Sequence, residues 1–334
     1  MMQANDFKGL YGTTPTRAKP GRERLTATDT VDLAETERLV GALIADGCGG
    51  LIALGTTGEC ATLSDADFKA FTSCVVDTVR GRIPAFLGAT AMGGHETARR
   101  LAHVADIGAE GSLLGLPMWQ PLTTRMAIDF FTEVSAAFPE LAIMAYANAR
   151  AFRFAFSVEF WAAISKTAPT VTSAKVSRPV GLLEQITATG GRINFMPSDM
   201  VAGAFYHLSP DTTPAAWATA AGMDPAPSVA LVKAITKRDD LMRDALVAAI
   251  AWANEPIHSL VSNPDLFASY NIQMEKTRIN AAGYSKAGPV RSPYDDFPDD
   301  LAAEARLCAS RWVTICAALK AGTITHKPWL EVAA

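Results

Sequence analysis

Lys175 is the residue whose surroundings most clearly predict chemistry. It lies in the apolar and β-branched run TVTSAKVS (170–177), which is typical of a central strand. A lysine inside such a strand loses solvation, which disfavours the ammonium form and lowers its pKa towards neutrality. A neutral, buried amine is what attack on a carbonyl carbon requires. The alternative is a lysine at a strand end whose amine reaches water or pairs with a carboxylate.

Two other strand ends carry polar groups suited to the same chemistry. Thr56, Thr57 and Gly58 follow an apolar run in a tight turn before a helix. Hydroxyls and backbone N–H groups in such a turn are able to bind a carboxylate without a competing cation. Tyr146 closes another apolar run and offers a phenol able to pass protons to a nearby amine. Taken singly, an ordinary glycine-containing turn and a tyrosine in the core explain these residues equally well.

These residues belong to a repeat in which short apolar runs alternate with amphipathic segments. The runs expected as strands are residues 7–14, 50–57, 83–90, 111–117, 141–148, 170–177, 192–199 and 214–222. The helical periodicity between them is clearest in residues 30–47, 65–79, 95–108 and 125–138. In the first of these segments we expect Thr30 to cap the helix and Gly47 to end it. Continuous apolar strands that alternate with amphipathic helices predict a parallel sheet covered on its outer face.

Eight strand–helix units predict an α/β fold, a (β/α)8 TIM barrel with a C-terminal helical extension. An open doubly wound sheet would carry GxGxxG after its first strand, and GTTGE (55–59) is neither that motif nor a P-loop. The three segments after residue 222 read as helices: 228–261, 267–283 and 299–322. We expect the barrel through its eighth strand in residues 1–224. The last barrel helix and the extension are expected in residues 225–334, within a single structural domain.

The composition argues against several classes of protein. Hydrophobic residues make up 49% of the chain and charged residues 19%, which favours a large core over disorder. A net charge of -4 argues against nucleic acid or a membrane surface as the main partner. No uncharged apolar run approaches the roughly 18 residues of a membrane span, and no signal-peptide stretch begins the chain, so a cytoplasmic location is expected. The five cysteines and five histidines lack metal-ligand or disulfide spacing, and no metal site is expected.

A resemblance to a known family joins the three sites. GLIALGTTGECATLS, then YANARAF, then the strand lysine resemble the dihydrodipicolinate synthase / N-acetylneuraminate lyase superfamily of class I pyruvate aldolases. GYSKAGPVRSPY (283–294) resembles the GPxRxP segment of that family, so the likeness runs over essentially the whole chain. It implies that Lys175 forms a Schiff base, that Thr56 and Thr57 bind the pyruvyl carboxylate, and that Tyr146 is the proton shuttle. It also implies a homotetramer. Because the lysine serves as electron sink, no cofactor is needed.

Departures from the family pattern narrow the expected reaction. Lysine-pathway synthases have a tyrosine pair where this chain has Pro117, Met118 and Trp119, and an arginine where it has Ala151. Dihydrodipicolinate synthesis is therefore disfavoured. LPMWQP, YANARAFRF and YNIQMEKTRINAAG instead resemble the hydratase-aldolase branch. Its members cleave ortho-substituted benzalpyruvates, such as trans-o-hydroxybenzylidenepyruvate and trans-2'-carboxybenzalpyruvate, to an aromatic aldehyde and pyruvate in the degradation of polycyclic aromatic hydrocarbons.

Further residues are expected at the barrel mouth. Strand alternation places Asn148 on the same face as Tyr146, and the branch resemblance implies that Asn148 positions a water molecule. Four apolar residues are expected to form a slot for an aryl ring: Met118, Trp119, Phe152 and Trp217. Other candidates at the mouth are Asn271, which we assign to substrate binding, and Gln273, Ser198, Asp199, Arg150, Arg153 and Arg178.

Three other functions remain open from the sequence. Another class I lyase or dehydratase of the superfamily would act on a sugar-derived 2-keto acid, whose hydroxyl groups call for more polar side chains than this mouth offers. A noncatalytic small-molecule-binding barrel would not need the lysine, the tyrosine and the threonine pair together. A metal-dependent class II aldolase would need carboxylate and histidine ligands at the strand ends.

Overall fold

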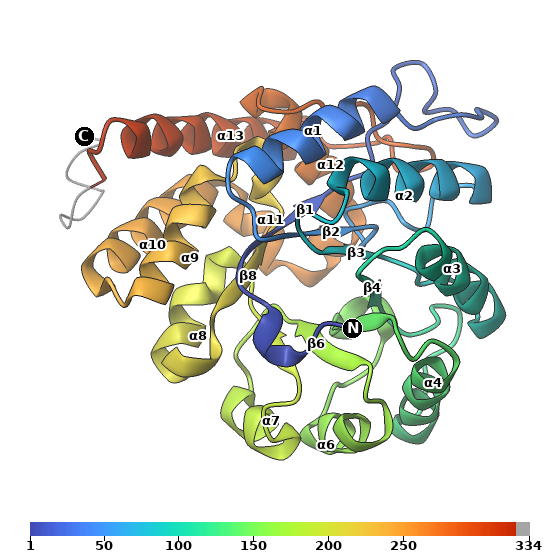
Figure 1. The fold of residues 1–334 in the computed structure, drawn as a ribbon. Coiled ribbons are helices and arrows are strands. Elements are labelled where there is room, and N and C mark those ends of the chain that lie inside the picture. The colour runs from blue at the N-terminus through green and yellow to red at the C-terminus, as the bar shows by residue number, and fades with distance from the viewer. Residues whose placement is uncertain (325–334) are drawn as a thin grey trace.

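The computed structural model describes residues 1–324, in which eight strands form one parallel sheet that curls into a barrel (Figure 1). The strands are β1 (Gly9–Thr14), β2 (Gly50–Ala53), β3 (Ala85–Leu87), β4 (Gly111–Leu114), β5 (Ala142–Tyr146), β6 (Val171–Lys175), β7 (Asn194–Met196) and β8 (Ala215–Ala218). Each lies within one of the eight runs expected as strands. The predicted (β/α)8 barrel is confirmed.

The sheet closes where its last strands meet. Neighbouring strands pair in parallel and in chain order from β1 to β7, and β8 pairs with β1. Between β7 and β8 the contact is a bridge from Ser198 to Trp217, where the Trp217 N–H donates to the Pro197 carbonyl at 2.8 Å. This bridge brings the first and last parts of the sheet together, so that the carboxyl ends of all eight strands face one mouth.

Helices that follow the strands form the outer layer around the barrel (Figure 1). They are α1 (Leu33–Ala45), α2 (Asp65–Val79), α3 (Gly94–Asp106), α4 (Thr124–Ala137), α5 (Ala149–Phe152), α6 (Val158–Thr167), α7 (Leu182–Thr189), α8 (Ala202–Leu208) and α9 (Ala226–Lys237). The four helices expected between the early strands are confirmed. The N-cap of α1, however, is Asp32, whose side chain accepts from the Glu35 N–H. The expectation of Thr30 was wrong because that hydroxyl bonds to Asp67 instead.

Large side chains fill the barrel interior. Phe7, Tyr11 and Phe86 pack together at its floor, with the ring centroids of Phe7 and Phe86 5.3 Å apart. Gly50 makes room for them, because a Cβ there would lie 2.3 Å from the Tyr11 ring. The interior is therefore a packed core, and chemistry is restricted to the mouth.

The chain after α9 continues as helices that pack on one side of the barrel (Figure 1). They are α10 (Asp240–Asn254), α11 (His258–Ser262), α12 (Pro264–Ala282) and α13 (Asp299–Lys320). Short 3-10 helices occur at η1 (Ala4–Asp6), η2 (Asp199–Val201), η3 (Pro210–Thr212), η4 (Ala220–Met223) and η5 (Glu255–Ile257). Of the helices in residues 1–324, none is long and apolar enough to cross a bilayer. The predicted helical extension is confirmed.

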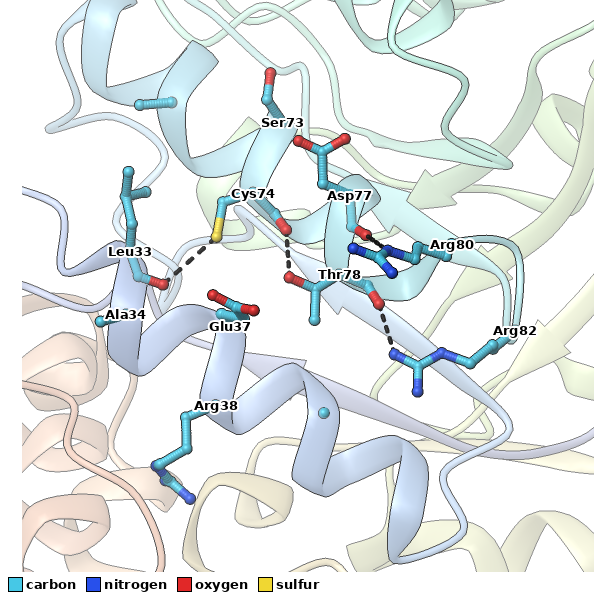
Figure 2. A pocket seen from close by; sticks show the side chains of 12 residues that line it. Leu33, Ala34, Glu37, Arg38, Ser73, Cys74, Asp77, Thr78, Arg80 and Arg82 are labelled. Carbon is cyan, nitrogen blue, oxygen red and sulfur yellow. Dashed lines mark hydrogen bonds between the residues drawn. The ribbon is translucent and has the colours of Figure 1, made fainter.

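A groove of about 1040 Å³ lies between α1 and α2 in the outer layer (Figure 2). Its polar groups bond largely to the helix backbones: Cys74 donates to the Leu33 carbonyl, Thr78 to the Cys74 carbonyl, and Arg82 to the Thr78 carbonyl. The lining residues come from the two helices and from the segment that leads into β3. The groove is therefore separate from the barrel mouth.

Candidate active site

Lys175 is the last residue of β6, and its Cα lies in register with Tyr146 on β5 and Met196 on β7. Its side chain is 6% exposed. The amine lies 3.3 Å from the centroid of the Trp217 indole and 4.8 Å from that of the Tyr146 ring. Within residues 1–324 it makes no ion pair and no hydrogen bond. Burial lowers the pKa of Lys175 to about 7, while the Glu275 carboxylate opposes that change. A substantial fraction of this amine is therefore neutral near pH 7.

Trp217 is a residue of β8, and its indole ring covers the Lys175 amine. Its indole Nε1 donates to the Val176 carbonyl at 3.1 Å, which fixes the ring against the strand that carries Lys175. The face of an indole attracts a cation through its quadrupole and offers no hydrogen-bond acceptor. Trp217 therefore accompanies the amine in either protonation state.

Tyr146 is joined to two of the other predicted residues. Its hydroxyl lies 3.1 Å from the Thr56 hydroxyl and accepts from the Asn148 side-chain amide at 3.2 Å. Burial raises the pKa of Tyr146, and the two hydrogen bonds only partly oppose that effect. The phenol therefore keeps its proton at neutral pH and is able to donate it and take it back. The structure brings Lys175, Tyr146, Thr56 and Asn148 together.

Asn148 has its orientation fixed from both ends. Its side-chain Oδ1 accepts from the Ala151 N–H at 3.1 Å, so that Asn148 is the N-cap of α5. The opposite amide orientation would set an NH2 group against that N–H. With Nδ2 directed at Tyr146, one amide hydrogen is left for a further acceptor.

The turn after β2 uses some of its donors internally. We expected the Gly58 N–H to bind a ligand carboxylate. In the structure this N–H donates to the Gly55 carbonyl at 3.1 Å and is already used. Gly58 is required for space, because a Cβ there would lie 2.8 Å from the Leu54 nitrogen. In contrast, the Thr57 hydroxyl and N–H make no hydrogen bond within the described part of the chain. Thr57 is the residue of this turn with donors to spare.

The residues expected to form an apolar slot differ in their burial. Phe152 is buried, meets the Tyr146 ring edge to face with centroids 5.5 Å apart, and occupies the space that a side chain at position 115 would fill. Met118 is half-buried against the outer core, and Trp119 is 71% exposed. The Phe152 ring thus packs between Tyr146 and Gly115, where the missing side chain of Gly115 leaves room for it. The slot for an aryl ring stays a prediction.

Two of the three candidate arginines have protein partners. Arg150 donates to the Pro264 carbonyl at 3.0 Å and lies over the Phe267 ring, which ties the loop after β5 to the start of α12. Arg153 donates to the carbonyls of Met118 and Trp119. Arg178 is exposed, three residues past the end of β6 at Lys175, and makes no ion pair among the described residues.

Residues predicted on α12 and after β7 are buried and mostly bonded. Asn271 donates to the Phe267 carbonyl at 2.6 Å, and its Oδ1 has no partner within residues 1–324. Gln273 donates to the Asp296 carbonyl. Asp199 accepts from Ser228 at 2.6 Å, and burial raises its pKa to about 6. The backbone of Ser198 forms the bridge that closes the barrel.

A buried ion pair on α12 was not anticipated from the sequence. Arg278 binds Glu275 through two nitrogens, and both residues bond the Thr219 hydroxyl at the end of β8. Their spacing of three along a helix is a signal for such a pair, but it does not indicate burial. Through this pair a carboxylate is held near the Lys175 amine without touching it. Among residues 1–324, no cluster of three or more His, Cys, Asp or Glu side chains is arranged to hold a metal ion.

Comparisons with known proteins agree with this geometry. The sequence model of the Dihydrodipicolinate synthetase family matches residues 25–304. The chain is 36% identical over 317 residues to a trans-O-hydroxybenzylidenepyruvate hydratase-aldolase of Pseudomonas aeruginosa, covering 94% of each chain. It is 35% identical over 301 residues to a trans-2'-carboxybenzalpyruvate hydratase-aldolase of Nocardioides sp. (strain KP7), covering 88% of this chain and 89% of that relative.

A solved structure described as PhdJ bound to substrate intermediate superimposes with a TM-score of 0.89 at 30% identity. The superposition covers 94% of this chain and 98% of that one. The likeness thus extends over the barrel and the C-terminal helices together.

Proposed function

The chain belongs to the dihydrodipicolinate synthetase family, and on this premise we propose that it is a Schiff-base-forming hydratase-aldolase. It cleaves an ortho-substituted benzalpyruvate to an aromatic aldehyde and pyruvate. Its relatives are named as hydratase-aldolases of two such compounds. The observation that carries the proposal is the Lys175 amine, which is enclosed in the barrel beside two aromatic rings and is not paired with any carboxylate in the described residues. A carbon–carbon lyase that uses a lysine needs such an amine.

In the first half of the reaction Lys175 attacks the C2 carbonyl of the substrate. Loss of water gives an iminium conjugated with the C3–C4 double bond, which makes the benzylic C4 electrophilic. Water adds at C4, and the resulting enamine is protonated at C3. Asn148 positions this water with its remaining amide hydrogen, and Tyr146 moves the protons.

In the second half the new hydroxyl at C4 loses its proton and the C3–C4 bond breaks. The electron pair passes to the iminium, so the products at this point are the aromatic aldehyde and an enamine of pyruvate. Protonation at C3 and hydrolysis release pyruvate and the free amine. The balance is one substrate and one water giving one aldehyde and one pyruvate, with Lys175 as the electron sink. The substrate carboxylate is bound by Thr56 and Thr57. The Thr56 hydroxyl lies beside that of Tyr146, and the Thr57 hydroxyl and N–H have no other partner in the described chain.

Two experiments test the proposal. Sodium borohydride with pyruvate should convert Lys175 to its N-(1-carboxyethyl) derivative, located by peptide mass spectrometry. Loss of ultraviolet absorbance should follow the cleavage of ortho-hydroxy and ortho-carboxy benzalpyruvates. A protein that is not labelled at Lys175, or that cleaves only hydroxyl-rich 2-keto acids, would refute the assignment.

We further propose that the enzyme is a cytoplasmic homotetramer and that residues 225–324 fold with the barrel as one domain; residues 325–334 of the expected extension lie outside the described residues. All five cysteines are unpaired, which suits a reducing compartment. The family resemblance supports the tetramer, and the α12 ion pair to Thr219 supports the single domain. Light scattering should give the mass of four chains, and chemical unfolding should follow a single transition.

A further inference from the structure

Glu59 directly follows the Thr56–Gly58 turn and has no assigned part in the reaction. Its carboxylate has no exposed surface and pairs with the Lys276 amine at 2.6 Å and with the Arg291 guanidinium. It also accepts the backbone N–H of Arg291 at 3.0 Å. One carboxylate therefore joins the turn to α12 and to the segment that follows it.

The same segments hold the turn at a second point. Arg291 donates to the Thr16 and Arg17 carbonyls and to the Thr30 hydroxyl, which orders the loop after β1. From that loop the Thr16 hydroxyl donates to the Gly58 carbonyl at 2.6 Å. The turn is thus fixed both through a side chain and through its backbone.

The turn needs this support because of its backbone conformation. Glu59 has φ +57°, in the left-handed region, where the Cβ of a non-glycine residue is strained against its own backbone. In this conformation the Glu59 N–H donates to the Thr56 carbonyl and the Gly58 N–H to the Gly55 carbonyl. The Thr57 hydroxyl and N–H are left without partners in the described chain.

We propose that Glu59 is the positioning residue of the substrate-carboxylate site: its bonds to Lys276 and Arg291 hold the turn in the conformation that presents the Thr56 and Thr57 donors. This inference rests on the proposed function, since it assumes that a 2-oxo acid forms an iminium with Lys175. Glu59 itself does not touch the substrate. It acts through the two threonines.

The electrostatics of the cluster determine which variant tests this. Glu59, Lys276 and Arg291 together carry one net positive charge in their ionised forms. Glu59→Gln alone would add a positive charge near the substrate carboxylate, which opposes the effect of a loosened turn, and would leave a buried cation uncompensated. Glu59→Gln with Lys276→Met removes one charge of each sign and keeps side-chain lengths. The net charge of the cluster is therefore unchanged in this double variant. Weaker binding of the substrate carboxylate would then reflect a loosened Thr56–Gly58 turn and not a change of charge.

The experiment compares pyruvate with pyruvamide, which has the same ketone but a neutral amide. The fraction of Lys175 trapped by borohydride is measured against the concentration of each ketone. In the double variant the half-saturating pyruvate concentration should rise roughly tenfold to a hundredfold, the loss expected for a charge-assisted hydrogen bond. That for pyruvamide should change less than about threefold, because its trapping depends on the amine and not on the carboxylate site.

Glu35→Gln with Arg38→Met is the matched control. Glu35 also pairs with an arginine and accepts a backbone N–H from the C-terminal segment, that of Lys286, but it does not contact the turn. The control should leave both half-saturating concentrations as in the wild type.

A second probe avoids disturbing a buried ion pair. Thr16→Val removes the donor to the Gly58 carbonyl. It should raise the half-saturating concentration of pyruvate more than that of pyruvamide. Equal weakening of both ketones in these variants, or unchanged pyruvate binding, would overturn the role of Glu59. Absence of trapping in the wild type would instead refute the proposed function.

Discussion

Two buried lysines of this chain, Lys175 and Lys276, differ in their surroundings more than in their burial. Their exposed fractions are 6% and 1%. Lys276 pairs with Glu59 and donates to the Pro289 carbonyl at 2.7 Å, whereas Lys175 contacts the faces of two aromatic rings. Burial lowers the pKa of both, to about 7 for Lys175 and to about 8 for Lys276, where Glu59 opposes the change.

Burial by itself therefore does not make a lysine reactive. Lys276 has hydrogen-bond acceptors for its ammonium form, and these fix it in a structural role. Lys175 has no such acceptor in the described chain, so losing its proton breaks no bond. The neutral amine is also beside a phenol that is able to exchange protons.

Lys175→Ala should lower kcat by about 10⁴-fold or more, because no other amine replaces the electron sink. Borohydride with pyruvate should no longer label the protein, as measured by intact mass. Lys276→Ala, corrected for the folded fraction, should still be labelled. Labelling that moves to Lys276 or persists without Lys175 would erase the distinction between the two lysines.

Tyr146→Phe should lower kcat by about 10³-fold, since the ring stays while the proton carrier is lost. Trapping of pyruvate on Lys175 should persist at saturating pyruvate. Tyr206→Phe, on α8 and in contact with Arg243, serves as a control and should leave kcat unchanged. Normal turnover in Tyr146→Phe would show that the phenol is not what separates Lys175 from Lys276.

Substitution by methionine should change stability in opposite directions at the two lysines. Lys276→Met should cost about 3 kcal/mol in urea unfolding, because Glu59 loses one buried partner and keeps Arg291. Lys175→Met should stabilise the protein, since its folded pKa of about 7 lies below the unfolded value of 10.5. The folded state then resists protonation, so the gain is full below pH 7 and fades as pH rises from about 7 towards 10.5. Destabilisation by both variants at pH 6 would contradict this.

The rate of iminium trapping should rise about tenfold per pH unit below pH 7 and level off above it, because only the neutral amine attacks. The rate is measured at subsaturating pyruvate with a fixed quench time. A midpoint near 10 would mean that Lys175 is solvated like an ordinary surface lysine.

Glu275→Gln should move that midpoint to lower pH by less than about one unit. Glu275 is the carboxylate that raises the pKa of Lys175, and its loss leaves Arg278 as an added positive charge. The profile of Glu35→Gln should coincide with that of the wild type. An upward shift in Glu275→Gln would contradict the electrostatic picture.

The elements and the reactive group were predictable because their signals are local. Apolar runs that alternate with amphipathic segments gave all eight strands, and a lysine within such a run is recognisable as buried. Strand alternation predicted Asn148 beside Tyr146, and the two side chains do bond, although β5 ends at Tyr146 and Asn148 is the N-cap of α5. Each of these inferences needs only a few neighbouring residues.

The supporting contacts were not predictable because they join distant parts of the chain. Glu59 and Arg291 are separated by 232 positions, and no periodicity relates them. Phe152 is an aromatic residue of the kind that lines binding sites. Only the space at Gly115, which is distant in sequence, shows that its ring packs against Tyr146. Thr30 fits an N-cap by type, but its competing bond to Asp67 depends on how α2 packs.

The bridge between Ser198 and Trp217 closes the barrel, and the same tryptophan covers the Lys175 amine. The bridge uses the backbone N–H of Trp217, which every residue except proline would keep, whereas the cover over the amine comes from the indole side chain. A substitution at Trp217 is therefore free to change the protonation of Lys175 while the barrel stays closed.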